Sequence, residues 1–243
     1  MTELQKMGKK AKEAAEKLAC AGNLKDKALL AMAAAIEEKE EEILRANEED
    51  LQAAREGGMK PSLLDRLALN HSRIASMAEG IRQVAAQQDP VGEILEGSVR
   101  PNGMRIRRVR VPLGVVGIIY EARPNVTADA AALCLKAGNA VILRGGKAAI
   151  RSNSAILDIM ADAAQKAGLP DGSMQLVRDT SRESSREMMG LTGYLDVLIP
   201  RGGAGLIRAV VEGAKVPVIE TGVGSCHLFI DESADEAMAV EIA

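Results

Sequence analysis

Two glycine loops contain the residues of this 243-residue chain that are best suited to bind an anion. Glycine lets a backbone approach a phosphate closely, and basic side chains beside it add charge. A Gly-Gly pair also makes ordinary tight turns, so one such loop alone favours neither interpretation. Two loops of the same design favour phosphate binding. The residues concerned are Arg144, Gly145, Gly146 and Lys147 in the first loop, and Arg201, Gly202 and Gly203 in the second.

Both loops are expected at the same edge of a parallel sheet. Each follows an apolar run typical of a buried strand, Ala140–Leu143 and Leu195–Ile199, and each precedes a helical pattern. Ligands of open α/β sheets bind at the carboxyl ends of the strands, where helix N-termini present free N–H groups. No GxGxxG motif follows the first strand, so the usual dinucleotide fingerprint is missing.

Asn125 and Glu220 also follow predicted strands. Asn125 could cap the helix that it opens or direct its amide at a substrate, and capping is the favoured interpretation on the local pattern alone. Glu220 could act as a general base or contact a ligand, although a carboxylate in such a place is more often structural. The sequence pattern therefore predicts where Asn125 and Glu220 lie in the fold but not which role each side chain has.

The three cysteines predict neither a metal site nor an activated nucleophile. Cys134 lies on the apolar face of a predicted helix, which indicates core packing. Cys226 and His227 are neighbours in a predicted strand, so their side chains should point to opposite faces. Cys20 has no partner in sequence, and only His71 and His227 could join the cysteines in a zinc site. No metal is expected.

The order of the elements predicts a doubly wound α/β fold with a parallel sheet, preceded by a helical segment. That segment runs from Glu3 to Val84, with breaks at 21–23 and 57–61, and Asp89-Pro90 ends it. The strands are predicted at Val115–Tyr120, Ala140–Leu143, Met174–Val177, Leu195–Ile199, Val216–Ile219 and His227–Ile230, and the helices near Thr127–Lys136, Ser152–Ala167, Arg182–Met189, Ala204–Glu212 and from Ala234 onward. The last helix has no stop signal before Ala243, so the chain is expected to end within an element.

Arg100–Val111 alternates basic and apolar residues with a slip at Arg107-Arg108 that suits a bulge. It could be a basic nucleic-acid ribbon, but an amphipathic hairpin strand that pairs with another subunit is the preferred interpretation. The net charge of −3 gives no general reason to bind nucleic acid or a membrane. No apolar run is long enough to span a bilayer and no signal-peptide core is present, so we expect a cytoplasmic, soluble protein.

Several sequence blocks resemble the γ-glutamyl phosphate reductase family of the aldehyde dehydrogenase superfamily. They are Pro112–Thr127, Lys136–Asn139, Leu143–Lys147, Tyr194–Gly203 and Glu220–Asp231. The resemblance implies a helical part of the cofactor domain at 1–97 and a basic oligomerisation ribbon at 98–111. It further implies a Rossmann-like, aldehyde-dehydrogenase-like dinucleotide domain at 112–224 and the start of a truncated catalytic domain at 225–243.

The resemblance implies reduction of γ-glutamyl phosphate to glutamate-5-semialdehyde, with NADP(H) as cofactor and release of phosphate, through a cysteine thioester. Asn125 matches the amide that holds the oxyanion, and Glu220 matches an acid whose role is open because no water is activated here. The nucleophilic cysteine is expected beyond Ala243. Lys147 beside Arg144 should attract a 2′-phosphate. A homo-oligomer is expected, and a non-catalytic dinucleotide-binding or assembly module is the alternative.

Overall fold

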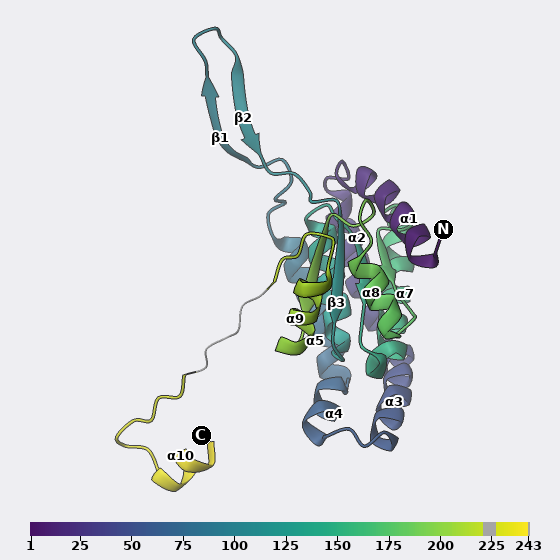
Figure 1. Ribbon diagram of the computed structural model, residues 1–243, viewed down its shortest axis with the longest axis vertical. Coiled ribbons are helices and arrows are strands. Elements are labelled where there is room, and N and C mark those ends of the chain that lie inside the picture. The colour runs from purple at the N-terminus through teal and green to yellow at the C-terminus, as the bar shows by residue number, and fades with distance from the viewer. Residues whose placement is uncertain (221–226, 243) are drawn as a thin grey trace.

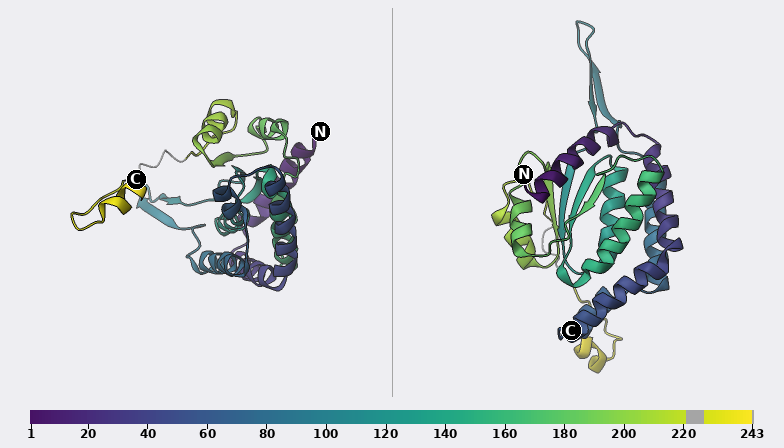
Figure 2. Two further views of the ribbon diagram at one scale, coloured as in Figure 1. Left: turned by 90° about the horizontal axis from the view of Figure 1, so that it is seen from below. Right: turned by 90° about the vertical axis from the view of Figure 1, so that its right-hand side faces the viewer.

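A computed structural model describes residues 1–220 and 227–242 of the chain. Its centre is a parallel sheet of four strands in the order β5-β4-β3-β6. The strands are β3 (Val115–Tyr120), β4 (Ala140–Arg144), β5 (Met174–Leu176) and β6 (Val197–Arg201). Every residue of β3 is buried, because helices cover both faces of the sheet. The predicted doubly wound α/β fold is confirmed (Figure 2).

The connections explain how the sheet is covered. Helix α6 (Pro124–Lys136) joins β3 to β4, and α7 (Ile150–Lys166) joins β4 to β5, so right-handed crossovers place both helices on one face. The chain then returns across the sheet through α8 (Arg182–Met189), which lies on the opposite face. Helix α1 (Glu3–Leu18) also packs against the sheet, and Thr2 at its start hydrogen-bonds to Glu187 of α8.

The other N-terminal helices form an outer layer against α6 and α7. This layer contains α2 (Leu24–Glu38), α3 (Glu40–Glu56), α4 (Pro61–Leu67) and α5 (His71–Ala86). Two buried lysines join the layers: Lys25 donates to Asp89 (2.9 Å) and to the Lys136 carbonyl (3.0 Å), and Lys136 donates to Asp26 (2.5 Å). The outer layer and the sheet therefore share one core.

The predicted helix breaks at 21–23 and 57–61 are present, and Pro61 opens α4 as a first-turn proline. Two further breaks were not predicted. One falls at Lys39 inside the acidic run 37–42, and the other separates α4 from α5, where the Asn70 side chain caps the Arg73 amide (2.8 Å).

The basic segment belongs to a hairpin that projects from the body (Figure 1). Strand β1 (Ile94–Val99) pairs antiparallel with β2 (Arg105–Val109), and all residues of both strands are exposed. The hairpin thus begins at Ile94, ahead of the expected ribbon at 98–111. The predicted bulge at Arg107-Arg108 is wrong in its strand: the register shift lies in β1 between Ile94 and Glu96, opposite Arg108 and Val109.

Two predicted strands near the C-terminus are not formed. Val216–Ile219 follows α9 (Ala204–Gly213) and makes a single parallel bridge, Val218 to Leu198, beside β6. Pro217 lacks an N–H, which prevents a continuous ladder there. His227–Ile230 is exposed and has no regular secondary structure, with no strand beside it among the described residues. The predicted helix from Ala234 is present as α10 (Glu236–Ile242). Residues 221–226, which contain Cys226 and the expected domain boundary at 224/225, lie outside the described residues.

Candidate functional site

The two glycine loops lie at one edge of the sheet, on either side of the loop that follows β3. Strands β4 and β6 both pair with β3, so residues 144–147 and 201–203 flank Glu121–Arg123. An ideal Cβ at Gly146 would lie 3.2 Å from the Ala122 nitrogen, and one at Gly202 would lie 2.7 Å from Cδ of Glu121. These glycines therefore serve close packing against the β3 loop, which the sequence pattern did not distinguish from anion binding.

The N-terminus of α9 already holds a negative charge. The Gly203 amide donates to Oε1 of Glu121 (2.8 Å), so a side-chain carboxylate occupies the position where a bound anion was expected. This contact shows that the helix terminus accommodates an anionic oxygen. A phosphate at this point would have to replace Glu121.

The two basic residues of the first loop differ in their contacts. Arg144 is half-buried and donates through Nη2 to the carbonyls of Thr180 (2.7 Å) and Ser181 (2.8 Å). Burial lowers the pKa of Arg144, and the Asp179 carboxylate opposes that shift. Arg144 therefore fastens the connection between β5 and α8. The Lys147 side chain is exposed and forms no hydrogen bond or ion pair with any residue that the structure describes.

A buried polar chain that the sequence did not predict lies beneath the first loop. The Tyr120 hydroxyl and Thr127 Oγ1 are 2.6 Å apart, and Thr127 donates to Oδ1 of Asn153 (3.0 Å). Burial raises the pKa of Tyr120, with a smaller opposing effect of the Thr127 hydrogen bond, so the phenol is neutral. A Cβ at Gly145 would come within 2.3 Å of Nδ2 of Asn153. The loop therefore rests directly on this chain.

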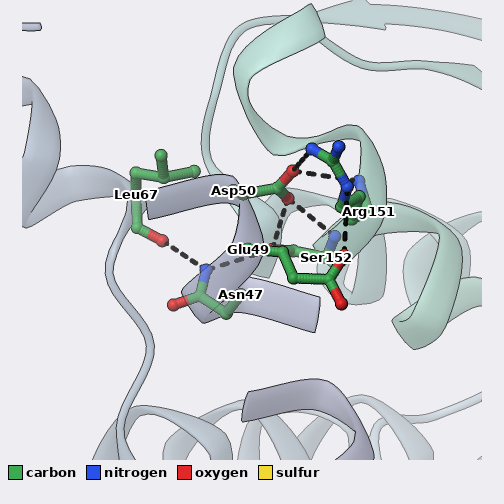
Figure 3. A network of polar contacts seen from close by, with 6 residues as sticks. All are labelled: Asn47, Glu49, Asp50, Leu67, Arg151 and Ser152. Carbon is green, nitrogen blue, oxygen red and sulfur yellow. Dashed lines mark hydrogen bonds and ion pairs between the residues drawn. The ribbon is translucent and has the colours of Figure 1, made fainter. Parts of the chain in front are cut away.

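A second network, also not predicted, holds the start of α7 (Figure 3). Oδ2 of the buried Asp50 accepts hydrogen bonds from the Ser152 amide (2.8 Å) and hydroxyl (2.7 Å). Asn47 donates to Ser152 Oγ (3.0 Å) and to the Leu67 carbonyl (2.9 Å). Helix α3 thus supplies the cap that α7 lacks in its own sequence. Asn47 and Asp50 recur at the same helical spacing as the buried apolar residues of α3, and this periodicity is the signal in the sequence from which the network could have been found.

Asn125 does not cap α6, so the favoured interpretation from the sequence is wrong. Pro124 takes the first helical position, where its missing N–H is harmless, and Arg123 is the cap residue. The Asn125 side chain is one position further in, and its Nδ2 donates to Oδ2 of Asp129 (3.2 Å). Burial raises the pKa of Asp129, and this hydrogen bond opposes the shift.

A cleft of about 700 Å³ opens at this edge between α6 and the ends of β3 and β6. A second hollow of about 410 Å³ lies against α4 and α5. The cleft brings Asn125 together with Arg201, Gly202 and Gly203, whereas residues 144–147 do not line it. Glu220 is exposed and follows Val218, the bridge partner of Leu198, by two residues.

The cysteines that are described do not look like nucleophiles. Cys134 borders the cleft but is buried, and burial raises the pKa of its thiol to about 12. Core packing, as predicted, accounts for it. Cys20 is exposed after α1 and away from the cleft residues. Among the described residues, no group of histidines, cysteines and carboxylates could hold a metal ion.

The sequence matches the aldehyde dehydrogenase family over residues 2–243. The chain belongs to the aldehyde dehydrogenase family. Members of this family use NAD(P). The γ-glutamyl phosphate reductase of Heliobacterium modesticaldum is 60% identical over 242 residues, which are 99% of this chain and 58% of that protein. The same-named protein of Carboxydothermus hydrogenoformans is 57% identical over 100% of this chain and 59% of its own length.

Two solved structures of γ-glutamyl phosphate reductases have the same fold as this chain. The crystal structure of γ-glutamyl phosphate reductase from Thermotoga maritima superimposes with a TM-score of 0.91 at 47% identity, over 99% of this chain and 58% of that chain. The corresponding structure from Saccharomyces cerevisiae gives a TM-score of 0.84 at 32% identity, over 90% of this chain and 56% of that chain. The resemblance inferred from the sequence blocks is confirmed. The chain spans somewhat more than half the length of these relatives. No helix in the described ranges is long and apolar enough to cross a membrane.

Proposed function

We propose that the chain forms the cofactor-binding part of an enzyme that reduces γ-glutamyl phosphate to glutamate-5-semialdehyde, with release of phosphate, in cytoplasmic proline biosynthesis. The observation that supports this best is the identity of 55–60% to several proteins named γ-glutamyl phosphate reductase along nearly the whole chain. In this reaction a cysteine thiolate attacks the acyl carbon and phosphate leaves, after which the thioester is reduced and the thiolate is released.

Bound NADPH would supply the hydride for that reduction. The residues that fit this cofactor are the exposed Lys147, whose ammonium suits a 2′-phosphate, and the N-terminus of α9 at Gly203, which accepts an anionic oxygen. Arg201 and Gly202 lie at the same terminus. Arg144 and the Gly145-Gly146 pair contribute indirectly, since their contacts fix the loop that carries Lys147.

Asn125 is proposed to stabilise the oxyanion. Its amide has two N–H groups, and one of them is bound to Asp129. The other is available to an oxygen that becomes negative at the reacting carbon. The nucleophile is assigned to no cysteine among the described residues, because burial raises the pKa of Cys134 and Cys20 does not line the cleft. Glu220 faces solvent and is assigned no proton transfer.

Calorimetric titration of the chain with NADPH and with NADH tests the cofactor proposal. We expect NADPH to bind about tenfold or more tightly than NADH, a difference of at least about 1.4 kcal/mol. The Lys147→Ala variant should lose most of that difference, because it removes the charge next to the 2′-phosphate. Lys166→Ala is the matched control, since Lys166 on α7 is paired with Asp162 (2.8 Å). An unchanged preference in Lys147→Ala would contradict the assignment.

The hairpin is proposed to mediate homo-oligomerisation. Its exposed apolar side chains include Ile94, Val99, Met104 and Ile106. An isolated pair of strands is marginally stable in water, so a partner that covers it would stabilise it. An assembly module without catalytic activity would show this association and NADPH binding, but a longer native form of it would not reduce γ-glutamyl phosphate.

A further inference from the structure

The two hollows at the sheet edge meet around one acidic side chain. The cleft beside β3 and β6 and the hollow against α4 and α5 share the lining residues Arg66, Arg123, Asn125 and Asp129. Side chains of both charges thus border one continuous surface. Arg66 and Arg123 are exposed, whereas Asp129 is half-buried, and a carboxylate that is partly withdrawn from water normally pairs with a cation or a ligand.

Asp129 has no cationic partner among the described residues. It is half-buried, and its side chain accepts one hydrogen bond, from the Asn125 amide (3.2 Å). Burial raises its pKa, with the Asn125 hydrogen bond opposing, which indicates that the surroundings do not compensate the negative charge. Helix α5 leaves space here, because an ideal Cβ at Gly80 would have Oδ1 of Asp129 at 3.9 Å as its nearest neighbour.

Two arginines beside this carboxylate are also unpaired within the described part of the chain. A third arginine that lines the hollow, Arg73, forms an ion pair with Asp65 (2.9 Å) and donates a hydrogen bond to the Ala68 carbonyl (2.7 Å). Arg73 is therefore already paired within the protein and is not a candidate to bind a ligand. Arg66 and Arg123 border both hollows and form no ion pair with described residues. A guanidinium group without an ion-pair partner can bind a carboxylate ligand through two parallel hydrogen bonds.

We propose that this surface binds the head group of an α-amino acid, with Asp129 holding the α-ammonium and Arg66 and Arg123 holding the α-carboxylate. The inference rests on the proposed function and specifies how its substrate class is recognised. Asp129 follows Asn125 by four residues, a rise of about 6 Å along the helix axis. That rise is comparable to the separation of the α-nitrogen and the acyl oxygen in an extended glutamyl group. A substrate could therefore place its head group at Asp129 and its acyl oxygen at Asn125.

The test is a titration of the full chain followed by NMR of ¹³C-methyl methionine, because Met77 borders the hollow. The probes are L-glutamate, glutarate, which lacks the ammonium, and 4-aminobutyrate, which lacks the α-carboxylate. We expect L-glutamate to shift the Met77 signal and to bind at least about tenfold more tightly than either analogue. Asp129→Asn should abolish that preference over glutarate, and Arg123→Gln should abolish the preference over 4-aminobutyrate.

Asp158→Asn serves as the matched control, since Asp158 on α7 is exposed and paired with Arg178 (2.7 Å). Equal binding of L-glutamate and glutarate, or no response to L-glutamate, would overturn the head-group assignment. NADPH added to the same samples separates the two proposals. A response to NADPH without one to L-glutamate contradicts only the head-group site, and the reverse contradicts only the cofactor site.

Discussion

Single glycines at the sheet edge are constrained by packing. An ideal Cβ at Gly145 would lie 2.3 Å from Nδ2 of Asn153 and 3.1 Å from the Tyr120 hydroxyl. We expect Gly145→Ala to destabilise the fold by about 1–3 kcal/mol, as overpacking does elsewhere, in urea unfolding followed by circular dichroism. Gly205→Ala is the matched control, because nothing lies within 4 Å of its added Cβ. Equal effects of the two substitutions would contradict this account.

Asp129 should reduce stability at neutral pH. Its folded-state pKa is raised by burial, so between the unfolded and folded pKa values the native state binds the additional proton and stability falls as pH rises. Above the folded pKa the penalty is complete, and below the unfolded value of about 3.9 it is absent. We therefore expect Asp129→Asn to raise the melting temperature at pH 7 but not at pH 3. A lower melting temperature at pH 7 would mean that the carboxylate is compensated in the fold.

Residue positions were predicted better than residue contacts. The sequence located Asn125, Gly145 and Gly202 at strand ends, because chain order alone fixes which edge of a parallel sheet they reach. It did not show that Arg144 binds carbonyls of the β5–α8 connection. It also assigned Asn125 to a cap, although Pro124 already fixes the first helical turn. Such contacts depend on residues distant in sequence, which a local pattern does not contain.

Among the elements, helix α7 depends on α3 for its N-terminal cap. Removing the buried carboxylate in Asp50→Ala leaves the Ser152 amide and hydroxyl without their acceptor. We expect a loss of about 2–3 kcal/mol of unfolding free energy, measured by urea titration, together with weaker NADPH binding because the Lys147 loop leads into α7. Glu49→Ala is the control: its exposed pair with Arg151 (3.2 Å) should contribute less than about 1 kcal/mol. Similar losses in both variants would argue against the cap.

The predicted strands are present where a neighbouring strand is available to pair with them. Val115–Tyr120 and Ala140–Leu143 are continuous apolar runs that pair with each other, and the fold contains them as expected. Val216–Ile219 and His227–Ile230 have equally suitable residues, but a strand forms only beside a partner. The first finds one bridge to β6, and the second has none among the described residues. Strand propensity is a property of the local sequence, whereas a hydrogen-bonded ladder also requires a neighbouring strand.

Across the whole molecule, the N-terminal helices and the sheet form one unit. The buried Lys25 of α2 bonds the Asp89 carboxylate after α5 and the Lys136 carbonyl of α6, and the buried Lys136 in turn bonds the Asp26 carboxylate of α2 and a carbonyl of α5. Removal of one of these partners would leave an ammonium buried and uncompensated, which is strongly unfavourable. At the sheet edge that carries the site, the outer layer acts through α3, whose Asp50 and Asn47 bind Ser152 at the start of α7.

The projecting hairpin is not stabilised by this common core. Val99 is 68% exposed and Ile106 is 40% exposed, on strands whose edges are open to further pairing. We expect the double variant Val99→Lys and Ile106→Lys to keep the melting temperature and NADPH affinity of the unmodified chain but to lower its sedimentation coefficient toward that of a monomer. Val240→Lys is the control for added charge at an exposed apolar site, since Val240 on α10 is 74% exposed. If the unmodified chain already sediments as a monomer, or if the double variant remains associated, then the hairpin does not hold subunits together.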